Sequence, residues 1–208
     1  AVFVEDTAVV LDEVAIVARP GAASRRPEVE PVAEVLREHR PLRRIREPGT
    51  LDGGDVLRID RTLFVGASAR TNPAGRHQLA EIADELGYEV VTVALRGCLH
   101  LKTAATAVAE RTVLVNPEWI GPAAFAGLER IEVHPDEPFA ANALWLGAVD
   151  GADVVVHAAE FPRTRARLER RGIEVRTAPA SELAKAEGGV TCCSIVLRTG
   201  ARTGHGSD

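Results

Sequence analysis

One local pattern recurs four times along this chain of 208 residues, at a spacing of roughly 40–50 residues. In each copy, two runs rich in β-branched residues flank a polar turn, which predicts a pair of strands, and a helix and often a further strand follow. The strand pairs are expected at residues 2–19, 51–66, 99–116 and 142–159. Because such a repeat builds a fold from equivalent units, it constrains the architecture more than any single motif does.

The spacing of apolar residues and the position of stop signals predict the helices of these units. Apolar residues from Val29 to Leu36 fall at helical spacing. A second helix is predicted over 72–87, where Gly87 is a natural stop. Further helices are expected around 122–130 and 162–172, and further strands at 88–95, 131–134 and 173–178.

A fifth opening, GVTCCSIVLR, begins at Gly189, and no further unit follows it. Four units and this orphan strand predict a closed ring of five α/β units, forming a single domain over residues 1–208. The chain also begins inside a strand, so we expect it to be a fragment, with the rest of the fifth unit ahead of Ala1. The alternative is a plain α/β sheet whose units resemble one another by accident.

Polar residues occupy matching places in these openings. A ring of repeats brings equivalent positions to one central axis, so residues far apart in sequence would converge. Carboxylates, an imidazole, an amide and a thiol in one small space are typical of nucleophilic catalysis on a cationic substrate. The matching residues are Glu5 and Asp6, Asp52 and Asp55, His100, Asn142, and Cys192.

Several of these residues also have ordinary structural explanations. Asp52-Gly53-Gly54-Asp55 is a typical turn sequence, although glycine at a strand entrance also lets a ligand approach closely. His100 alone would more often be a structural histidine. The other histidines are expected at the surface: His39, His77, His134, His157 and His205.

The three cysteines are Cys98, Cys192 and Cys193. An odd number with no disulfide framework predicts a reducing, cytoplasmic environment. No C-x-x-C spacing occurs, so a structural zinc site is not expected. In an alternating strand adjacent side chains face opposite ways, so only one of Cys192 and Cys193 can face the axis and the other is expected in the core. Cys98 is also expected to be structural.

Charge and hydropathy exclude some classes of function. The formal net charge of −5 argues against a nucleic-acid partner, since proteins that bind nucleic acids usually carry a basic patch. No apolar run approaches the roughly 20 residues that cross a bilayer, and no basic-then-apolar leader is visible. Most of the arginines are expected in solvent. Arg25 and Arg70 follow loops after paired strands, where a guanidinium can hold a carboxylate by a bidentate fork.

Six strings together resemble the dimethylarginine dimethylaminohydrolase family: FVEDTAVV, ARPGAASRRPEVE, LDGGDVL, VGASARTN, LHLKTA and VTCCS. Their order and spacing extend the similarity from Val2 to about Arg198. LDGGDVL with HLK and a C-terminal cysteine is typical of the wider guanidine-modifying superfamily, and FVED with the SRR string narrows it to this branch. The resemblance implies a five-bladed α/β propeller of pseudo-repeats, pentein-like, and a chain that starts well before Ala1.

The resemblance also implies a catalytic set. Cys192, the first cysteine of TCCS, matches the family nucleophile. His100 in LHLK matches the general acid and base, and Asp52 in LDGGD matches the carboxylate that orients it.

A second set is implied for substrate binding. Glu5 and Asp6 match the acids that bind the substituted guanidinium, and Arg25 and Arg70 match the residues that hold the amino-acid end. A backbone contact of the family falls at Ala186, whose side chain differs from that of other members.

The implied reaction is hydrolysis of a free N-methylated arginine to citrulline and methylamine or dimethylamine, with no metal or organic cofactor. A soft metal such as zinc would suit the thiolate and imidazole as an inhibitor. Three alternatives remain: an arginine deiminase-like hydrolase, an amidinotransferase, and a non-catalytic binding module on the same propeller. The presence of Cys192, His100 and the acids together argues against the last.

Overall fold

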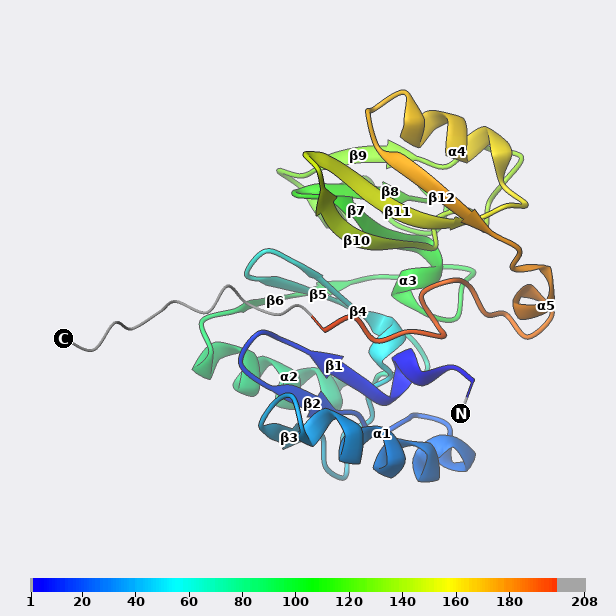
Figure 1. Ribbon diagram of the computed structural model, residues 1–208. Coiled ribbons are helices and arrows are strands. Elements are labelled where there is room, and N and C mark those ends of the chain that lie inside the picture. The colour runs from blue at the N-terminus through cyan, green and yellow to red at the C-terminus, as the bar shows by residue number, and fades with distance from the viewer. Residues whose placement is uncertain (1, 198–208) are drawn as a thin grey trace.

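A computed structural model describes residues 2–197. Over these residues the chain forms four three-stranded sheets with helices between them (Figure 1). In each sheet the first strand pairs antiparallel with the second, and the second pairs parallel with the third. A short hairpin joins the antiparallel pair, whereas the parallel pair needs a crossover segment. The fourfold repeat of one topology confirms the repeat predicted from the sequence.

The bounds of the units follow the chain in order. The first unit contains β1 (Ala8–Val10), β2 (Ala15–Val17), the 3-10 helix η2 (Ala23–Glu28), α1 (Val29–Arg37) and β3 (Leu42–Arg44). The second contains β4 (Val56–Ile59), β5 (Thr62–Gly66), α2 (Pro73–Glu85) and β6 (Glu89–Val93). The third contains β7 (Ala105–Ala109), β8 (Thr112–Val115), η4 (Pro122–Phe125) and β9 (Glu129–Glu132). The fourth contains β10 (Ala143–Val149), β11 (Ala152–Ala158), α4 (Pro162–Glu169) and β12 (Glu174–Ala178).

Four short elements stand outside these strands and longer helices, and three of them directly precede the first strand of a unit. They are η1 (Val4–Thr7), η3 (Gly53–Asp55), α3 (Leu101–Ala104) and α5 (Ser181–Ala184).

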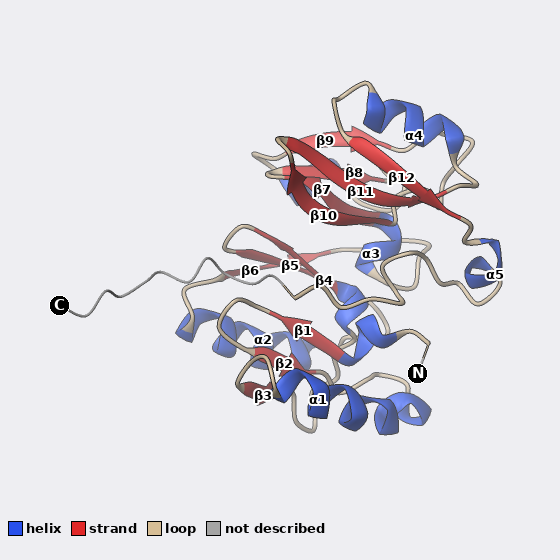
Figure 2. Ribbon diagram, viewed as in Figure 1, coloured by secondary structure: helices blue, strands red, loops and turns tan. Residues whose placement is uncertain are grey.

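The core lies between neighbouring units, and the longer helices lie on the outside (Figure 2). Leu63 of β5 and Leu79 of α2 pack with Ile16 of β2 in one apolar cluster that joins the first two units. Equivalent clusters join the second unit to the third and the third to the fourth. Each unit therefore buries its apolar face against the next, which explains why the units form one body.

The predicted stop at Gly87 is present at the end of α2, and the structure also shows a cap at its start. Asn72 precedes the helix and its side chain accepts a hydrogen bond from the backbone N–H of Gly75 at 2.8 Å, while Pro73 occupies the first helical position. Gly87 adopts a φ of 73°, a backbone conformation that favours glycine.

Two sequence predictions about the third and fourth units are wrong. The helix expected around 122–130 is only the 3-10 turn η4, because Gly127 adopts a φ of 80° and β9 begins at Glu129. His157, expected at the surface, is fully buried in β11, where its Nε2 lies 2.8 Å from the carbonyl oxygen of Ala140. This contact satisfies one ring nitrogen inside the core, and burial lowers the pKa of the imidazole. His205 lies outside the described residues.

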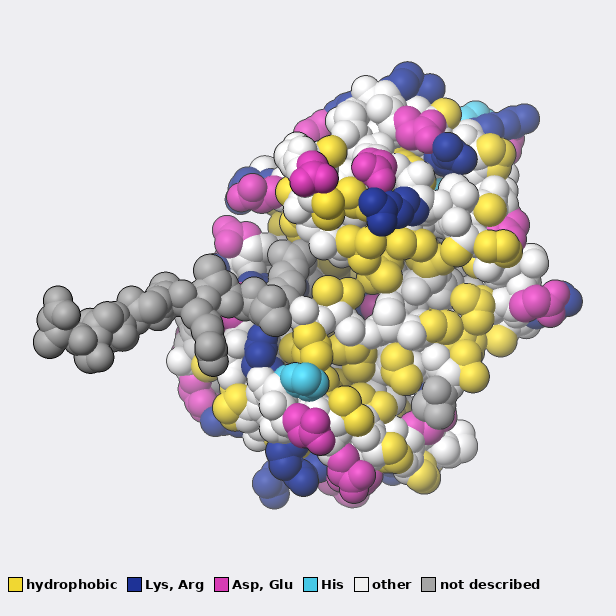
Figure 3. Space-filling model, in the orientation of Figure 1, with side chains coloured by type: hydrophobic (Ala, Val, Ile, Leu, Met, Phe, Trp, Pro, Cys, Tyr) yellow, Lys and Arg dark blue, Asp and Glu magenta, His cyan; other side chains and the backbone are white. Residues whose placement is uncertain are grey.

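The fifth opening does not form the strand that was predicted for residues 189–198. Residues 190–193 form a turn, and residues 194–197 continue without strand pairing; residue 198 is outside the described part of the chain. This segment crosses the middle of the view in Figure 1, with β1 of the first unit below it and β10 of the fourth unit above it. Hydrophobic side chains gather in a band along this middle region of the surface (Figure 3). None of the described helices is long and apolar enough to cross a membrane.

Candidate active site

The matching polar residues of the five openings come together in the structure. The backbone N–H of Glu5 donates to the carbonyl oxygen of Cys192 at 3.1 Å. His100 Nε2 lies 3.0 Å from Asp52 Oδ2, and its Nδ1 lies 3.8 Å from Asp6 Oδ1. The first and last openings are therefore neighbours, although 186 positions separate Glu5 from Thr191, whose hydroxyl donates to it.

The sequence pattern placed these residues in the opening strands. The structure places them in short turns instead, and in the four units these turns precede the first strand. Asp52 immediately precedes η3, and Gly53 within it passes so close to η1 that a Cβ would lie 2.1 Å from the carbonyl oxygen of Glu5. Asp52-Gly53-Gly54-Asp55 is thus both a turn and part of the site. Gly53 is required because the backbone of one carboxylate-bearing turn packs directly on that of another. A Cβ at Gly54 would instead meet the side chains of Asp6 and His100.

His100 is held in a defined orientation. It is 8% exposed and precedes α3, with Nε2 directed to Asp52, which is completely buried. Asp52 Oδ1 also accepts the backbone N–H of Gly21 at 2.9 Å, so the carboxylate itself is fixed. Burial alone lowers the pKa of His100, but the hydrogen bond to Asp52 and the charges of Asp6 and Asp55 outweigh it and raise the pKa above its usual value. The predicted pairing of His100 with Asp52 is present.

Cys192 is half-buried in the turn that follows Gly189. Burial, followed by the charge of Glu5, raises the pKa of its thiol to about 11. The backbone N–H of Gly189 donates to Sγ at 3.3 Å and partly offsets this effect. Cys193 is exposed, which corrects the expectation that it would be a core residue. The expectation assumed strand alternation, and the turn removes that alternation.

The two acids expected to bind a guanidinium already have cationic partners. Glu5 accepts from Lys102 Nζ at 2.8 Å through Oε1, and Asp6 accepts from Arg25 Nη1 at 2.5 Å through Oδ2. Both carboxylates are less than 10% exposed. Both carboxylates already bind a cationic side chain of the protein. They therefore have the charge and geometry to bind the guanidinium of a ligand.

Arg25 is more deeply engaged than the sequence indicated. Besides Asp6, its guanidinium donates to both carboxylate oxygens of Glu28, at 3.3 and 2.9 Å, and to the carbonyl oxygen of Phe3. The structure therefore places Arg25 directly behind Asp6.

The structure places Arg70 and Ala186 in two separate loops. Arg70 follows β5 in a loop whose backbone packs on Gly21, where a Cβ would lie 2.5 Å from the Arg70 carbonyl oxygen. Gly21 in turn donates to Asp52, so this loop borders the carboxylate that holds His100. Ala186 is exposed in the turn after α5, and its N–H donates to Leu183.

Asp55, one of the matching polar residues of the openings, is a buried acid to which the family resemblance assigned no catalytic or binding role. Its carboxylate accepts from Ser68 Oγ at 2.5 Å, Thr71 Oγ1 at 2.6 Å and the backbone N–H of Leu101 at 3.1 Å. Burial raises the pKa of this carboxyl. Asp55 thus ties the Arg70 loop to the start of α3, next to His100. The second acid of LDGGD was its signal in the sequence.

One set of described residues has the geometry of a metal site. Single ligand atoms of Asp6, Asp52 and His100 lie within 4.8 Å of one another. The same atoms are already engaged: Asp6 with Arg25 and Gly54, and Asp52 with His100 and Gly21. A hydrogen-bonded network of this kind suits proton transfer, and this explains the cluster without a metal ion.

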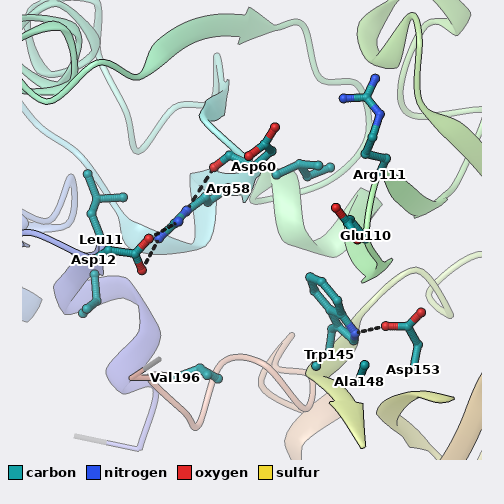
Figure 4. A pocket seen from close by; sticks show the side chains of 13 residues that line it. Leu11, Asp12, Arg58, Asp60, Glu110, Arg111, Trp145, Ala148, Asp153 and Val196 are labelled. Atoms are coloured by element: carbon teal, nitrogen blue, oxygen red, sulfur yellow. Dashed lines mark hydrogen bonds and ion pairs between the residues drawn. The ribbon is translucent and has the colours of Figure 1, made fainter. Parts of the chain in front are cut away.

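A cavity of about 520 Å³ lies at the other end of the strands (Figure 4). Hairpin turns of the four units line it, including Asp12, Asp60, Glu110 and Ala148. Its Arg58 forms a bidentate ion pair with Asp12, and Trp145 Nε1 donates to Asp153 at 2.9 Å. Cys192, His100 and Asp52 do not line this cavity, although Val196, four residues after Cys192, does.

Comparison with known proteins agrees with the geometry. A family described as N,N dimethylarginine dimethylhydrolase, eukaryotic, matches residues 1–197. An N(G),N(G)-dimethylarginine dimethylaminohydrolase of Streptomyces coelicolor is 42% identical over 199 residues, covering 95% of this chain and 74% of the relative. Its counterpart from Pseudomonas aeruginosa is 35% identical over 196 residues, covering 93% and 75%. The chain belongs to the dimethylarginine dimethylaminohydrolase family.

The fold agrees with a solved member of this family. A mutant of the Pseudomonas aeruginosa enzyme complexed with citrulline superposes with a TM-score of 0.85 at 35% identity, covering 92% of this chain and 74% of that one. The present chain therefore spans about three quarters of the length of these family members.

Proposed function

We propose that this chain hydrolyses free N-methylated arginine to citrulline and methylamine or dimethylamine. The observation that carries the proposal is the convergence of a thiol, a carboxylate-bound imidazole and two further carboxylates from distant openings. Cys192, His100 with Asp52, and Glu5 with Asp6 supply these groups. The family and the citrulline complex of the Pseudomonas aeruginosa relative support this choice of substrate.

Glu5 and Asp6 would bind the substrate guanidinium. The guanidinium carbon is a weak electrophile because its positive charge is delocalised. Carboxylates that fix its planar N–H groups align that carbon with the attacking sulfur and stabilise charge in the transition state. Their present partners, Lys102 and Arg25, keep the two carboxylates in place before the substrate arrives.

Arg25, Arg70 and the backbone of Ala186 would hold the amino-acid end of the substrate. A free amino acid presents a carboxylate to a guanidinium fork and an ammonium to a carbonyl oxygen. Arg70 lies on the loop beside Gly21, and Ala186 precedes the Cys192 turn.

Cys192 would attack the guanidinium carbon as the thiolate. A tetrahedral adduct forms, and His100 in its protonated state donates a proton to the leaving amine, so that methylamine or dimethylamine departs as a neutral molecule. The resulting S-alkylthiouronium is then attacked by water that His100, now neutral, deprotonates. Collapse of this second adduct breaks the C–S bond, releases citrulline and returns the thiol and the imidazole to their starting states.

The substrate itself would help to ionise Cys192. With a pKa of about 11 the thiol is protonated near neutral pH in the free protein, and the charge of Glu5 contributes to this. A bound cation compensates Glu5 and Asp6 and favours the thiolate. The nucleophile would then form mainly when there is a substrate to attack.

We also propose that the Cys192 segment is the opening of a fifth blade in a pentein-like propeller. It contacts both the first and the fourth units: Glu5 donates to Cys192, and Asn142 accepts from Thr191. Ile195 and Leu197 pack beside Ala8 and Leu36 of the first unit.

With no disulfide among the three cysteines, we place the protein in the reducing cytoplasm.

A citrulline assay on purified protein, run in parallel on dimethylarginine and arginine, tests this function. We expect turnover of dimethylarginine and little of arginine. The reverse preference would make the chain an arginine deiminase-like hydrolase. Ornithine and a guanidinylated amine, formed in place of citrulline when an acceptor amine is added, would indicate an amidinotransferase. No product from either substrate would contradict the proposal.

Adjacent cysteines provide a matched control for the nucleophile. Cys192→Ser should abolish turnover and the covalent adduct seen by mass spectrometry. Cys193→Ser should retain most of both, because its side chain is exposed, whereas that of Cys192 is half-buried. The opposite result would move the nucleophile to Cys193.

A further inference from the structure

Asn142 immediately precedes β10 and is 9% exposed. Its Oδ1 accepts the backbone N–H of Thr191 at 3.0 Å, and its Nδ2 donates to Thr191 Oγ1 at 2.9 Å and to the carbonyl oxygen of Lys102 at 3.0 Å. A carbonyl needs a donor and an N–H needs an acceptor, so these partners fix which way the carboxamide points.

The contacts of Asn142 pass directly to the reacting groups. Thr191 precedes Cys192, is 4% exposed, and donates its hydroxyl to Glu5 Oε2 at 2.7 Å. Glu5 closes the ring of contacts, because its N–H donates to Cys192 and its Oε1 accepts from Lys102 Nζ. Lys102 lies in α3, two residues after His100.

The turn that carries Cys192 is also packed on this carboxamide. A Cβ at Gly189 would lie 2.4 Å from Asn142 Oδ1, so the backbone there lies against Asn142. The same Gly189 donates its N–H to Cys192 Sγ. The position of the thiol therefore depends on the position of the amide.

We infer that Asn142 is a positioning residue, which fixes the Cys192 turn and the Glu5 carboxylate against α3, the helix that follows His100. It touches none of the reacting atoms; it acts through Thr191. The inference rests on the proposed function for its effect on turnover, and on geometry alone for its effect on the thiol.

Loss of this contact should change catalysis and thiol reactivity in opposite directions. Misplacement of reacting groups by about an ångström can cost roughly 100-fold in rate, so Asn142→Ala should lower kcat by roughly 10- to 100-fold. Burial is the largest reason for the raised pKa of Cys192. A loosened turn exposes the thiol, so iodoacetamide should alkylate Cys192 about threefold faster or more at pH 8.

The experiment uses the full chain with Cys193→Ser as the background, and peptide mass spectrometry to follow each thiol. Cys192 and Cys98 fall in different tryptic peptides, because Lys102 and Lys185 lie between them. Cys98 reports general loosening: it is half-buried, and burial raises the pKa of its thiol to about 11 as well. In Asn142→Ala we expect alkylation of Cys192 to become faster and alkylation of Cys98 to keep its rate.

Asn116→Ala is the matched control. Asn116 is also buried, at 1% exposure, and its carboxamide bonds Pro138 and Glu118 at 2.8 and 2.9 Å, away from Thr191. This variant should lose stability to a similar degree while kcat and Cys192 alkylation stay within about twofold of the background protein.

Thr191 provides the rescue. Thr191→Ser keeps the hydroxyl and should keep turnover, whereas Thr191→Val should lower kcat as Asn142→Ala does. Because the two residues act in one chain of contacts, the double variant Asn142→Ala with Thr191→Val should lose little more than the worse single variant.

The outcomes separate this inference from the proposed function. If the background protein makes no citrulline, the function fails, and the alkylation rates still test Asn142. Unchanged Cys192 alkylation in Asn142→Ala would overturn the inference. It would also be overturned by equal acceleration of Cys98, or by the same pattern in Asn116→Ala, since either would show a merely structural role.

Discussion

At the scale of single residues, the charge state of Cys192 depends first on burial and then on Glu5, whose charge the ammonium of Lys102 compensates. The thiol pKa is about 11 in the free protein, so the reactive thiolate fraction should rise about tenfold per pH unit from neutrality towards pH 11. Removing the ammonium in Lys102→Met leaves the charge of Glu5 uncompensated beside the thiol. We expect alkylation of Cys192 at pH 9 to slow by roughly threefold or more.

The control for this prediction is Lys185→Met. Lys185 pairs with Glu182 on the exposed α5, seven positions before Cys192. Its loss should leave the alkylation profile unchanged, and an equal slowing would show that general charge, and not the pair with Glu5, sets the reactivity.

His100 carries the proton in both halves of the proposed reaction, so its replacement should slow both. His100→Asn keeps a polar side chain towards Asp52 and should reduce adduct formation and adduct breakdown, with a total loss of about 10²–10⁴-fold. Single-turnover mass spectrometry separates the two steps. His77→Asn, an exposed change on α2, is the control. Near-normal turnover in the His100 variant would remove it from the mechanism.

Arg25 and Arg70 should differ in what they do for the substrate. Arg70→Ala should raise KM for dimethylarginine by about 10- to 150-fold, the range for a lost charge-assisted hydrogen bond. A simple alkylguanidine has no carboxylate and should be indifferent to that change. Arg25→Ala should weaken both substrates, because Arg25 also holds Asp6. If the kinetics of the alkylguanidine are unchanged in Arg25→Ala, the contact between Arg25 and Asp6 does not contribute to guanidinium binding.

At the scale of elements, the site depends on turns that pack backbone against backbone. A Cβ at Gly53 would lie 2.1 Å from the carbonyl oxygen of Glu5 and 2.7 Å from that of Ala8, and neither can move without shifting η1 or β1. Gly53→Ala should therefore lower the free energy of unfolding by about 1–3 kcal/mol and reduce turnover. Urea unfolding and the citrulline assay measure the two effects.

Gly121→Ala is the counterpart for that change, because a Cβ at Gly121 meets nothing within 4 Å. Its effect on unfolding should stay within about 0.5 kcal/mol. If both glycine variants behave alike, the close approach of η3 to η1 does not constrain the site.

The helices, strands and turns also show which parts of the fold the sequence patterns could predict. Strand pairs, α1 and α2 were predictable because apolar spacing, the Asn72 cap and the Gly87 stop are local signals. The convergence of Asp52 and His100 was predictable because equivalent positions in a repeat share one axis. The conformation of the openings was not, since their turns are set by contacts between openings far apart in sequence.

Three residues show the same limit more sharply. His157 is buried because a carbonyl oxygen of Ala140, 17 positions away, satisfies its Nε2, and no sequence pattern marks that partner. Cys192 and Cys193 looked like strand residues from their β-prone neighbours. Asn142 and Glu5, which belong to other units, instead hold the chain there in a turn.

At the scale of the whole molecule, the two ends of the described chain meet at the site. The units follow one another from the first to the fourth, and the segment after α5 then returns to the first. Function therefore depends on a tertiary contact that no single unit contains. Stability of the four sheets and competence of the site should be separable properties.

Ile195 tests this separation. It is half-buried and packs against the cluster of Ala8, Ala15 and Leu36, whereas its neighbour Val196 is 41% exposed. Ile195→Ser removes about 1 kcal/mol or more of apolar contact, which increases opening of the segment roughly fivefold or more. Turnover should fall and tryptic cleavage after Lys185 should accelerate, while far-UV circular dichroism of the four sheets is retained. Val196→Ser changes the same segment on its exposed side and should leave both rates near those of the unmodified chain. If Ile195→Ser instead keeps full turnover and slow cleavage, the return of the segment to the first unit does not hold Cys192 in place. The local turn with Gly189 and Asn142 would then have to do so unaided.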